Sequence, residues 1–514
     1  YKTFQATAEY NKTIGEHTFG ILAGYSWEQE DYRYVQGSRD KFPGNDLPYL
    51  NAGSPDNQKS EGTGNAWAIQ SGFGRLRYNF NERYLFESTV RYDGSSRFPQ
   101  SKKFGFFPSV AAGWRLSEEN FFKENESLGF ISNLKLKVSW GRLGNQNIGN
   151  YPYQSVYELG QNYPFGDTYT QGAAVTTAVD PTIKWEETET IDGGLEAVFW
   201  NGLLSVNASY FNRRTYDILY KPSGSVSTIL GQKISEMNTG ELKNFGWEFE
   251  VGHRNKIGDV SYNVNANLSI IKNKLTTLGV GNVEQLNGMV GNGSDLFIGY
   301  PIQMYYGYVS DGVFLDENDI KSWYDQSKVT PNPQPGDIRY KDISGPDGVP
   351  DGKIDPNYDR VYLGSRIPKF TFGLNLGVEY KGLDLSVLLQ GVAGVTGMLD
   401  GFAGWAFRGD GNIQKWQAEG RFDPANPTRY PAYPRLEDLS NSTTPNIVTS
   451  DFWTQDASYI RLKNIQLGYT FPKKMLQAAK ISNLRVYVQA ENPLCWNKYK
   501  PGWDPEINTS GNYY

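Results

Sequence analysis

Residues 261–270 read SYNVNANLSI, and they decide the fold because apolar and polar side chains alternate through the whole stretch. Tyr, Val, Ala, Leu and Ile occupy one set of alternate positions, and Asn and Ser occupy the other. Successive side chains of a β-strand point to opposite faces, so a period of two predicts a strand with one apolar and one polar face. The same pattern recurs at Asn133–Gly144, Phe370–Tyr380 and Leu484–Glu491. The sequence therefore predicts an all-β protein.

The predicted strands have the length and the aromatic ends of strands that cross a membrane. A β-strand tilted across a bilayer needs about 9–11 residues, and these segments are near that length. Aromatic rings favour the two membrane–water interfaces. Rings stand at the ends of the apolar stripes, at Tyr10, Trp27, Trp140, Tyr210, Trp247, Tyr262, Tyr380 and Tyr469. A soluble β-sandwich also alternates, but these two features favour a barrel whose apolar face meets lipid and whose polar face lines a wet lumen.

The composition excludes several other classes of protein. The chain has 514 residues, of which 38% are hydrophobic, and a net charge of −6. It contains no apolar run of about 18 residues, so no transmembrane helix is expected. Its charges are interspersed, whereas nucleic-acid binding needs a clustered basic face, so no nucleic-acid partner is expected. One cysteine, Cys495, excludes an internal disulfide and a CxxC zinc site. No catalytic motif is visible, so we expect neither catalytic residues nor an enzyme.

Short and long connections alternate along the chain. The short ones fall at 14–16, 79–83, 200–202, 254–259 and 380–383, with two helix-like ones at 117–132 and 472–482. The long ones fall at 29–65, 93–105, 142–185, 217–238, 272–367 and 395–456. Outer-membrane barrels of bacteria have short periplasmic turns and long extracellular loops. The sequence therefore predicts an antiparallel transmembrane β-barrel of about 14 strands, integral to the bacterial outer membrane, with long extracellular loops.

The long connections must all lie on one side of the membrane. The aromatic run IGYPIQMYYGYV at Ile298–Val309 could form a strand, but one more crossing would place the next loop on the wrong side. We therefore assign this run to the loop at 272–367. By the same rule, strands are expected to be missing before Tyr1 and after Tyr514. The chain would then be part of a plugged barrel of about 22 strands.

Six blocks of sequence are distinctive in their order and content. The first two are RYDGSSRF at Arg91–Phe98 and KFGFFPSVAAGWRLSEENFF at Lys103–Phe122. The other four lie at Gly299–Phe314, Gly336–Gly373, Ser450–Pro472 and Leu484–Glu506. These blocks are spread over most of the chain, and together they resemble the SusC/RagA-type TonB-dependent outer-membrane transporters.

This resemblance implies a nutrient importer. Members of the family form a barrel of about 22 strands filled by an N-terminal plug, and they take up oligosaccharides or peptides. A SusD-like surface lipoprotein covers the barrel as a lid, and TonB supplies the work through a box near the N-terminus. On this resemblance, residues 1–514 are a partial barrel that lacks the plug, the N-terminal strands and the last strand. The implied partners are the SusD-like lipoprotein, TonB, outer-membrane lipid and the oligosaccharide or peptide.

An acidic stretch of the 272–367 loop, DISGPDGVPDGKIDPNYD, is the single candidate metal site. Calcium takes 6–8 oxygen ligands, and carboxylates spaced two apart around a glycine suit it. The candidate ligands are Asp342, Asp347, Asp351, Asp355 and Asp359. The stretch departs from an EF-hand-like loop at its start, where Val349 stands at the third ligand position. The alternative to a structural calcium is a solvated turn rich in Asp and Gly, with no cofactor.

Aromatic residues of the two longest loops are the candidate contacts for substrate or lid protein. Rings stack on sugar faces and bury large areas at a small entropic cost. The candidates are Tyr305, Tyr306, Tyr308, Trp323, Phe402, Trp405, Phe407 and Trp416. The alternative is that these rings only pack the loops together.

Two other functions stay open on the sequence alone. A passive porin-like or adhesin-type barrel would have the same strands but would need neither a plug nor TonB. A soluble secreted polysaccharide-binding β protein would have the same alternation, and it would extract into buffer without detergent.

Overall fold

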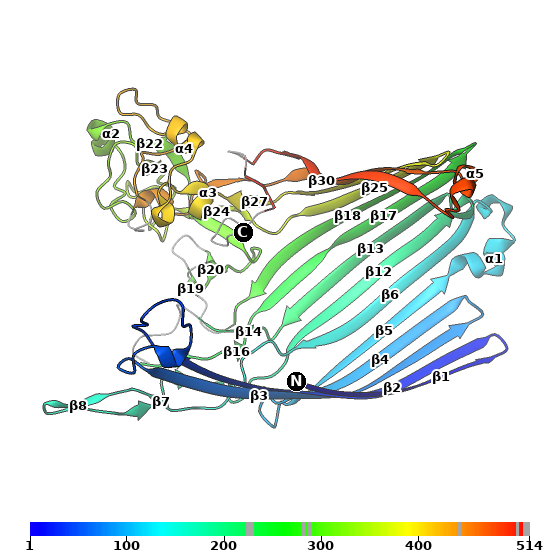
Figure 1. Cartoon of the computed structure of the whole chain (residues 1–514), viewed down its shortest axis with the longest axis horizontal. Coiled ribbons are helices and arrows are strands. Elements are labelled where there is room, and N and C mark those ends of the chain that lie inside the picture. The colour runs from blue at the N-terminus through cyan, green and yellow to red at the C-terminus, as the bar shows by residue number, and fades with distance from the viewer. Residues whose placement is uncertain are drawn as a thin grey trace.

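The protein is described by a computed structural model, which places residues 1–222, 231–279, 283–284, 289–292, 295–438, 444–499 and 503–506. Its main feature is one 14-stranded sheet, in which each strand pairs with the next strand of the sheet along the chain. The pairings between neighbouring strands are antiparallel. Figure 1 shows the strands side by side. The predicted antiparallel all-β fold is confirmed.

The strands of the sheet have the following bounds: β1 (Lys2–Ile14), β2 (His17–Ser38), β3 (Lys59–Phe80), β4 (Tyr84–Ser95), β5 (Phe104–Arg115), β6 (Ile131–Asn145), β12 (Glu186–Phe199), β13 (Leu204–Tyr216), β17 (Glu241–Ile257), β18 (Val260–Thr277), β25 (Phe370–Tyr380), β26 (Leu383–Ala393), β29 (Tyr459–Thr470) and β30 (Arg485–Asn497).

Short turns join the strands at one end of the sheet, and long connections join them at the other (Figure 1). The β1–β2 and β17–β18 turns contain Gly15 at φ 58° and Gly258 at φ 59°. Tight hairpin turns need such positive φ values, which glycine adopts without a steric penalty. Two short-side connections contain helices, α1 (Asn120–Lys123) and α5 (Lys473–Leu476). The predicted alternation of short and long connections is confirmed.

The two faces of the sheet differ in chemistry, as the period of two predicts. On β6, Val138 of the apolar face is 54% exposed, and Trp247 of the same face on β17 is 48% exposed. On the opposite face of β6, Lys135 and Lys137 form ion pairs with Glu196 of β12 at 3.1 Å and 3.0 Å. Large exposed apolar side chains on one side of a sheet mark a surface that meets another apolar medium. We call the apolar side the outer face and the polar side the inner face.

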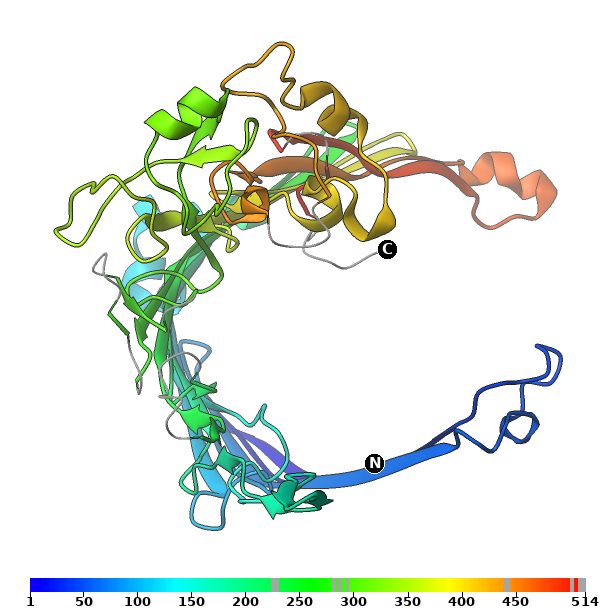
Figure 2. The same ribbon diagram turned by 90° about the vertical axis from the view of Figure 1, so that its left-hand side faces the viewer.

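The sheet curves into an open arc, with β1 to β3 at one end and β29 and β30 near the other (Figure 2). Among the described residues, β1 pairs only with β2, and β30 pairs only with β29. The inner face lines the concave side of the arc, because inner-face residues of separate strands, among them Asn11, Arg77 and Asp192, line one shared cavity. Ion pairs on this face, such as Arg485 with Asp384, lie opposite the exposed apolar stripes.

The aromatic run at Ile298–Val309 is not a strand of the large sheet, as the crossing rule predicts. Part of it forms β21 (Met304–Tyr308), which pairs with β24 (Arg360–Ser365) in a separate two-stranded sheet. All five residues of β21 are buried. A strand that faces lipid on one side and water on the other would not be buried along its whole length.

Most of the two longest connections fold into one compact unit at the long-connection end of the sheet (Figure 1). We call residues 295–369 and 394–458, so far as the structure describes them, the loop body. Its core contains Tyr340 and Tyr433, both fully buried, and Trp453, which is 1% exposed. Its elements are β21, β24, β22 (Ser310–Val313), β23 (Ile338–Tyr340), β27 (Thr396–Met398), β28 (Thr454–Asp456), α2 (Glu317–Ser322), α3 (Gly401–Gly404) and α4 (Lys415–Gly420).

Shorter elements occupy the other connections. They are β7 (Glu158–Leu159), β8 (Tyr163–Phe165), β9 (Thr168–Thr170), β10 (Ala173–Ala174), β11 (Thr177–Ala178), β14 (Leu219–Tyr220), β15 (Lys233–Ile234), β16 (Met237–Asn238), β19 (Val283–Glu284) and β20 (Val290–Gly291). Within the described ranges, no helix has both the length and the apolar character required to span a membrane.

Candidate functional site at the mouth of the sheet

A cavity of about 760 Å³ opens where the loop body meets the sheet. We call it the mouth cavity. Three separate parts of the chain line it: the β18–β25 connection, the β26–β29 connection with β27, and the segment after β30. Its lining residues are Asp295, Leu296, Ile302, Gln303, Met304, Tyr305, Arg366, Val395, Thr396, Gly397, Met398, Asp400, Ala457, Tyr499, Pro505 and Glu506.

One cation and one aromatic ring meet on the wall of this cavity. The Arg366 Nε atom donates a hydrogen bond of 2.9 Å to the Tyr305 hydroxyl, and the guanidinium lies 4.9 Å from the centroid of the ring. Burial raises the pKa of the Tyr305 hydroxyl above its ordinary value, so the ring stays neutral at physiological pH. The Arg366 guanidinium has further N–H donors that it can direct at a ligand.

Carboxylates from two other segments share the cavity. Asp400 precedes α3, and Glu506 belongs to the segment after β30. Glu506 accepts hydrogen bonds from the Tyr459 hydroxyl and, at 2.9 Å, from the Lys463 Nζ atom, and so ties this segment to the extracellular end of β29. The cavity thus combines a guanidinium, carboxylates and tyrosine rings in one concave space. Such a mixture suits a polar ligand that carries hydrogen-bonding groups of both kinds.

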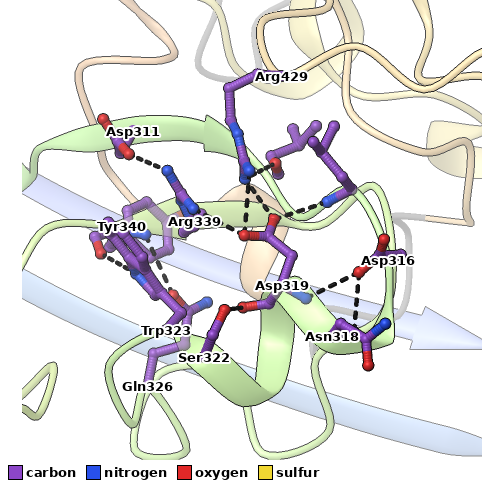
Figure 3. Close-up of polar contacts among 12 residues, drawn as sticks. Asp311, Asp316, Asn318, Asp319, Ser322, Trp323, Gln326, Arg339, Tyr340 and Arg429 are labelled. Atoms are coloured by element: carbon purple, nitrogen blue, oxygen red, sulfur yellow. Dashed lines mark hydrogen bonds and ion pairs between the residues drawn. The ribbon is translucent and has the colours of Figure 1, made fainter.

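A network of largely buried ion pairs joins the elements of the loop body to one another (Figure 3). Arg339 of β23 pairs with Asp311 of β22 and, at 3.0 Å, with Asp319 of α2. Arg429, from the β26–β29 connection, also binds Asp319 and donates 2.9 Å to the Val313 carbonyl. Because Arg429 and Asp319 lie 110 residues apart, this contact fastens the two longest connections to each other.

The Asp319 carboxylate is held in its charged form by these partners. Burial opposes the charge, but hydrogen bonds from Arg429 and from the Leu315 amide lower the pKa of Asp319 below its ordinary value. Arg339 also stacks on Trp323, with 3.6 Å between the guanidinium carbon and the ring centroid. The Trp323 indole nitrogen donates 2.9 Å to the Tyr340 carbonyl. These contacts make Trp323 part of the network.

The inner face below the mouth is polar and contains a second cavity, of about 720 Å³, toward the short turns. Small residues such as Gly20, Ala111 and Gly113 create this space, and Lys135 and Lys137 stand at its edge. Both lysines are paired with Glu196. On the same face, Asn207 of β13 pairs in register with Glu196 and donates 3.1 Å to Glu250. The inner face therefore presents charged and amide side chains to water near the short turns.

The eight predicted aromatic contacts do not form one surface. Tyr305, Tyr306 and Tyr308 are buried in β21, and of the eight rings only Tyr305 lines the mouth cavity. Trp405 packs against Arg408, at 4.8 Å, and the Trp416 indole donates to the Gln414 side chain. Phe402 and Phe407 are the exposed members, each at 37%. For most of these rings the geometry supports the alternative of loop packing, and their contact with substrate or lid stays a prediction.

Sequence reasoning did not single out Arg366, Asp400, Tyr499 and Glu506. They come from three connections, and none belongs to a motif with recognisable spacing. The available signal was weak: Arg366, Tyr499 and Glu506 lie within two of the distinctive sequence blocks.

The five predicted calcium ligands mostly act as acceptors for nearby backbone amides. Asp342 accepts from Gly352 at 2.6 Å, and Asp351 accepts from Lys353 at 3.0 Å. Asp355 forms an ion pair with Lys328. Among the described residues, no group of three or more His, Cys, Asp or Glu side chains is arranged to hold a metal ion. This geometry supports the alternative of a turn held by Asp side chains, and the calcium site stays a prediction.

The Asp359 carboxyl holds the turn in place, whereas Asp347 is exposed on it. Asp359 is fully buried and accepts from the amides of Ile343, Ser344 and Asp355, at 2.7, 3.1 and 2.6 Å. Burial raises the pKa of Asp359 despite these three donors. Asp347 lies at an exposed position of the same turn. Backbone amides thus occupy several of the oxygen atoms that a cation would need.

A curved antiparallel sheet with an apolar outer face, a polar inner face and long connections at one end defines an outer-membrane β-barrel protein. The family model described as "TonB dependent receptor-like, beta-barrel" matches residues 1–492. The chain therefore belongs to this family, and it is an integral protein of the bacterial outer membrane. This membership confirms the resemblance found in the sequence blocks and removes the soluble alternative.

Relatives of known name agree with the family. The chain is 29% identical to TonB-dependent receptor P3 of Formosa agariphila, over 97% of this chain and 48% of that protein. It is 28% identical to TonB-dependent receptor SusC of Bacteroides thetaiotaomicron, over 99% of this chain and 48% of that protein. The chain thus spans about half the length of the curated relatives it matches.

Solved structures agree on the fold. A structure of the RagAB peptide importer in the "open-open" state matches 99% of this chain and 52% of its own, with a TM-score of 0.78 and 25% identity. A structure of the RagAB peptide transporter matches 99% of this chain and 53% of its own, with a TM-score of 0.77 and 24% identity.

Proposed function

We propose that this chain forms a large part of the wall and the outer mouth of a nutrient importer that takes up oligosaccharides or peptides. The observation that carries the proposal is the mouth cavity, which lies at the long-connection end of a sheet whose inner face is polar. A captured ligand would move from the cavity along wettable side chains, which replace the hydrogen bonds it loses to water. No chemical step is needed for this function.

The partners of the importer follow from the family. TonB would supply the work, and a SusD-like surface lipoprotein would close the mouth over the captured ligand. The exposed rings Phe402 and Phe407 on the loop body suit contact with such a lid, because partly exposed aromatic side chains are enriched at protein interfaces. SusC is a named relative, and the name RagAB peptide importer belongs to a structural neighbour of similar fold. Both support the proposal.

The ligand would be held by charge and by ring contacts together. Arg366 would bind a carboxylate or a hydroxyl-rich face, and Asp400 and Glu506 would accept from amino or hydroxyl groups. Tyr305 and Tyr499 would supply the apolar contact. Peptides and oligosaccharides both offer these groups, so the cavity accommodates either class.

The proposal is tested with protein purified in detergent from the outer membrane of cells that do or do not contain TonB. Mass spectrometry identifies the lipoprotein and small ligands that co-purify, and uptake of labelled peptide and oligosaccharide mixtures is measured in the same cells. We expect a co-purifying lipoprotein and uptake that requires TonB. Uptake that is unchanged without TonB would support the passive-barrel alternative instead.

A paired variant tests the cavity itself. Arg366→Ala combined with Asp400→Asn removes two charged groups from the wall, and ligand retention should fall about tenfold, because a hydrogen bond to a charged group contributes about 1.5–3 kcal/mol. Lys415→Ala is the matched control, since Lys415 lies in the same loop body and its side chain is 85% exposed. Equal retention by the paired variant and the control would remove the mouth cavity from the mechanism.

A further inference from the structure

The outer face contains a row of basic residues at the long-connection end of β13, β17 and β18. Arg214 pairs in register with Lys243, and Lys243 pairs in register with Lys274. Directly paired residues point to the same face, so three cations lie side by side across three strands. Lys272 lies two residues from Lys274 and adds a fourth cation to that face. Like charges placed directly opposite each other in a sheet are destabilising.

Carboxylates of the protein neutralise only part of this row. Glu241 binds Arg214 at 2.6 Å and lies 3.8 Å from Lys243. Lys272 and Lys274 are exposed, and within the described part of the chain neither makes an ion pair or a side-chain hydrogen bond. The protein as a whole has a net charge of −6, so a surface with unneutralised cations departs from its average. Two of the four cations therefore lack a counter-ion.

An apolar stripe continues from this row along the same strands. Trp247 and Ile270 are paired in register, and they lie four residues from Lys243 and Lys274 respectively. Trp247 is stacked against Phe249, and both rings are exposed. Tyr210 of β13 lies beside Trp247, with 5.1 Å between the ring centroids. Cations thus stand just beyond an aromatic belt, at the level where a barrel passes from hydrocarbon to headgroups.

We propose that the outer face of β13, β17 and β18 binds an anionic outer-leaflet lipid, with its phosphate on Lys243, Lys272 and Lys274 and its acyl chain along Trp247 and Phe249. The phosphate supplies the missing counter-ion and relieves the repulsion between Lys243 and Lys274. The long lysine side chains reach the headgroup level while their stems cover the apolar surface. The site lies on the outer face, so it is separate from the mouth cavity and does not depend on the transported substrate.

Native mass spectrometry of the detergent-purified protein tests this proposal with three probes. These are monophosphoryl lipid A, phosphatidylcholine as a lipid without net charge, and inorganic phosphate. We expect retained lipid A and little retained phosphatidylcholine. The variant with Lys243→Gln, Lys272→Gln and Lys274→Gln should retain at least about tenfold less lipid A than the unaltered protein. Each lysine near an anionic surface raises the binding affinity by roughly fivefold. Binding should also weaken as ionic strength rises.

Two further variants separate lipid binding from folding and from total charge. Arginine at the same three positions should restore lipid retention, since arginine also binds phosphate. Lys321→Gln, Lys353→Gln and Lys415→Gln remove three lysines from the loop body and should leave retention unchanged. Equal retention of lipid A by the glutamine variant and the unaltered protein would overturn the proposal. Retention of inorganic phosphate without lipid A, or of both lipids equally, would also overturn it.

Discussion

The sheet and the loop body of this protein are stabilised in different ways. In the sheet, each side chain meets mainly its cross-strand neighbours, and large apolar residues such as Val138 stay exposed. In the loop body, Tyr340 and Tyr433 are fully buried, and ion pairs join segments more than 100 residues apart. The stability of the sheet therefore depends on its surroundings, which are lipid outside and water inside. The loop body has a core like that of a soluble domain.

The largest effect is expected in the core of the loop body. Trp453→Ala removes a ring that is 1% exposed and whose indole nitrogen donates 2.7 Å to the Asn446 carbonyl. Loss of a buried aromatic side chain costs about 3–5 kcal/mol. Limited proteolysis should then cut the loop body while the sheet stays resistant. The exposed Phe402→Ala is the control, and equal cleavage of sheet and loop body in the Trp453 variant would contradict the division into two regions.

A charge on the outer face should destabilise the protein nearly as much as the loss of the Trp453 side chain. Val138→Arg places a cation on the lipid side of β6, at an expected cost of about 2–4 kcal/mol near the bilayer midplane. Ser139→Arg places the same charge one residue further, on the inner face, and it should be tolerated. Folding into lipid vesicles, followed by denaturant titration, measures both. If Ser139→Arg proved the more damaging variant, the assignment of the two faces would be reversed.

The ion-pair network should make the loop body more sensitive to acid than the sheet. The folded pKa of Asp319 lies below its ordinary value of 3.8, so its contribution to stability is complete above that pH. It is lost as the pH falls through the lower, folded pKa. Asp319→Asn should therefore destabilise the loop body at neutral pH. The stability of the loop body should then fall less steeply as the pH is lowered. Proteolysis of the loop body across a pH series measures this, and an unchanged acid slope in the variant would contradict it.

The smallest effect is expected for an ion pair on the inner face. Glu196→Gln weakens the contacts with Lys135 and Lys137, which are partly exposed to water. Such pairs contribute about 0–1 kcal/mol, so thermal unfolding should change little. A loss as large as that of Trp453→Ala would mean that the inner face behaves like a dry core, and the contrast between the two regions would fail.

The sheet was predictable from the sequence because its rule is local. A period of two in SYNVNANLSI is enough to place a strand and to sort its two faces, and hairpin pairing follows from short turns such as the one at Gly258. The inferences about strands and hairpins use residues that are close together in the chain. The exclusion of Ile298–Val309 from the sheet needed one further rule, the alternation of short and long connections along the chain.

The candidate site was not predictable in the same way, because it is assembled from distant segments. Arg366, Asp400 and Glu506 meet only when three connections fold together, and no spacing rule connects them. Of the β21 rings predicted as ligand contacts, Tyr306 and Tyr308 are buried outside the lining of the mouth cavity, and Tyr305 lines it. The acidic stretch has the composition of a calcium loop, but backbone amides occupy Asp342, Asp351 and Asp359. Composition identified side chains that could bind a ligand or a metal ion. Long-range packing decides which of them line the cavity and which are buried or bonded to the backbone.

The most direct test of the two-faced sheet is an accessibility scan of β6 in lipid vesicles. Cys495 is first replaced by serine, and single cysteines are then introduced at Leu136, Lys137, Val138 and Ser139. A water-soluble thiol reagent should modify positions 137 and 139, and a bromolipid should quench a fluorophore attached at positions 136 and 138. Alternation with this phase would support a lipid-facing outer face and a wet inner face. Uniform labelling, or the opposite phase, would contradict it.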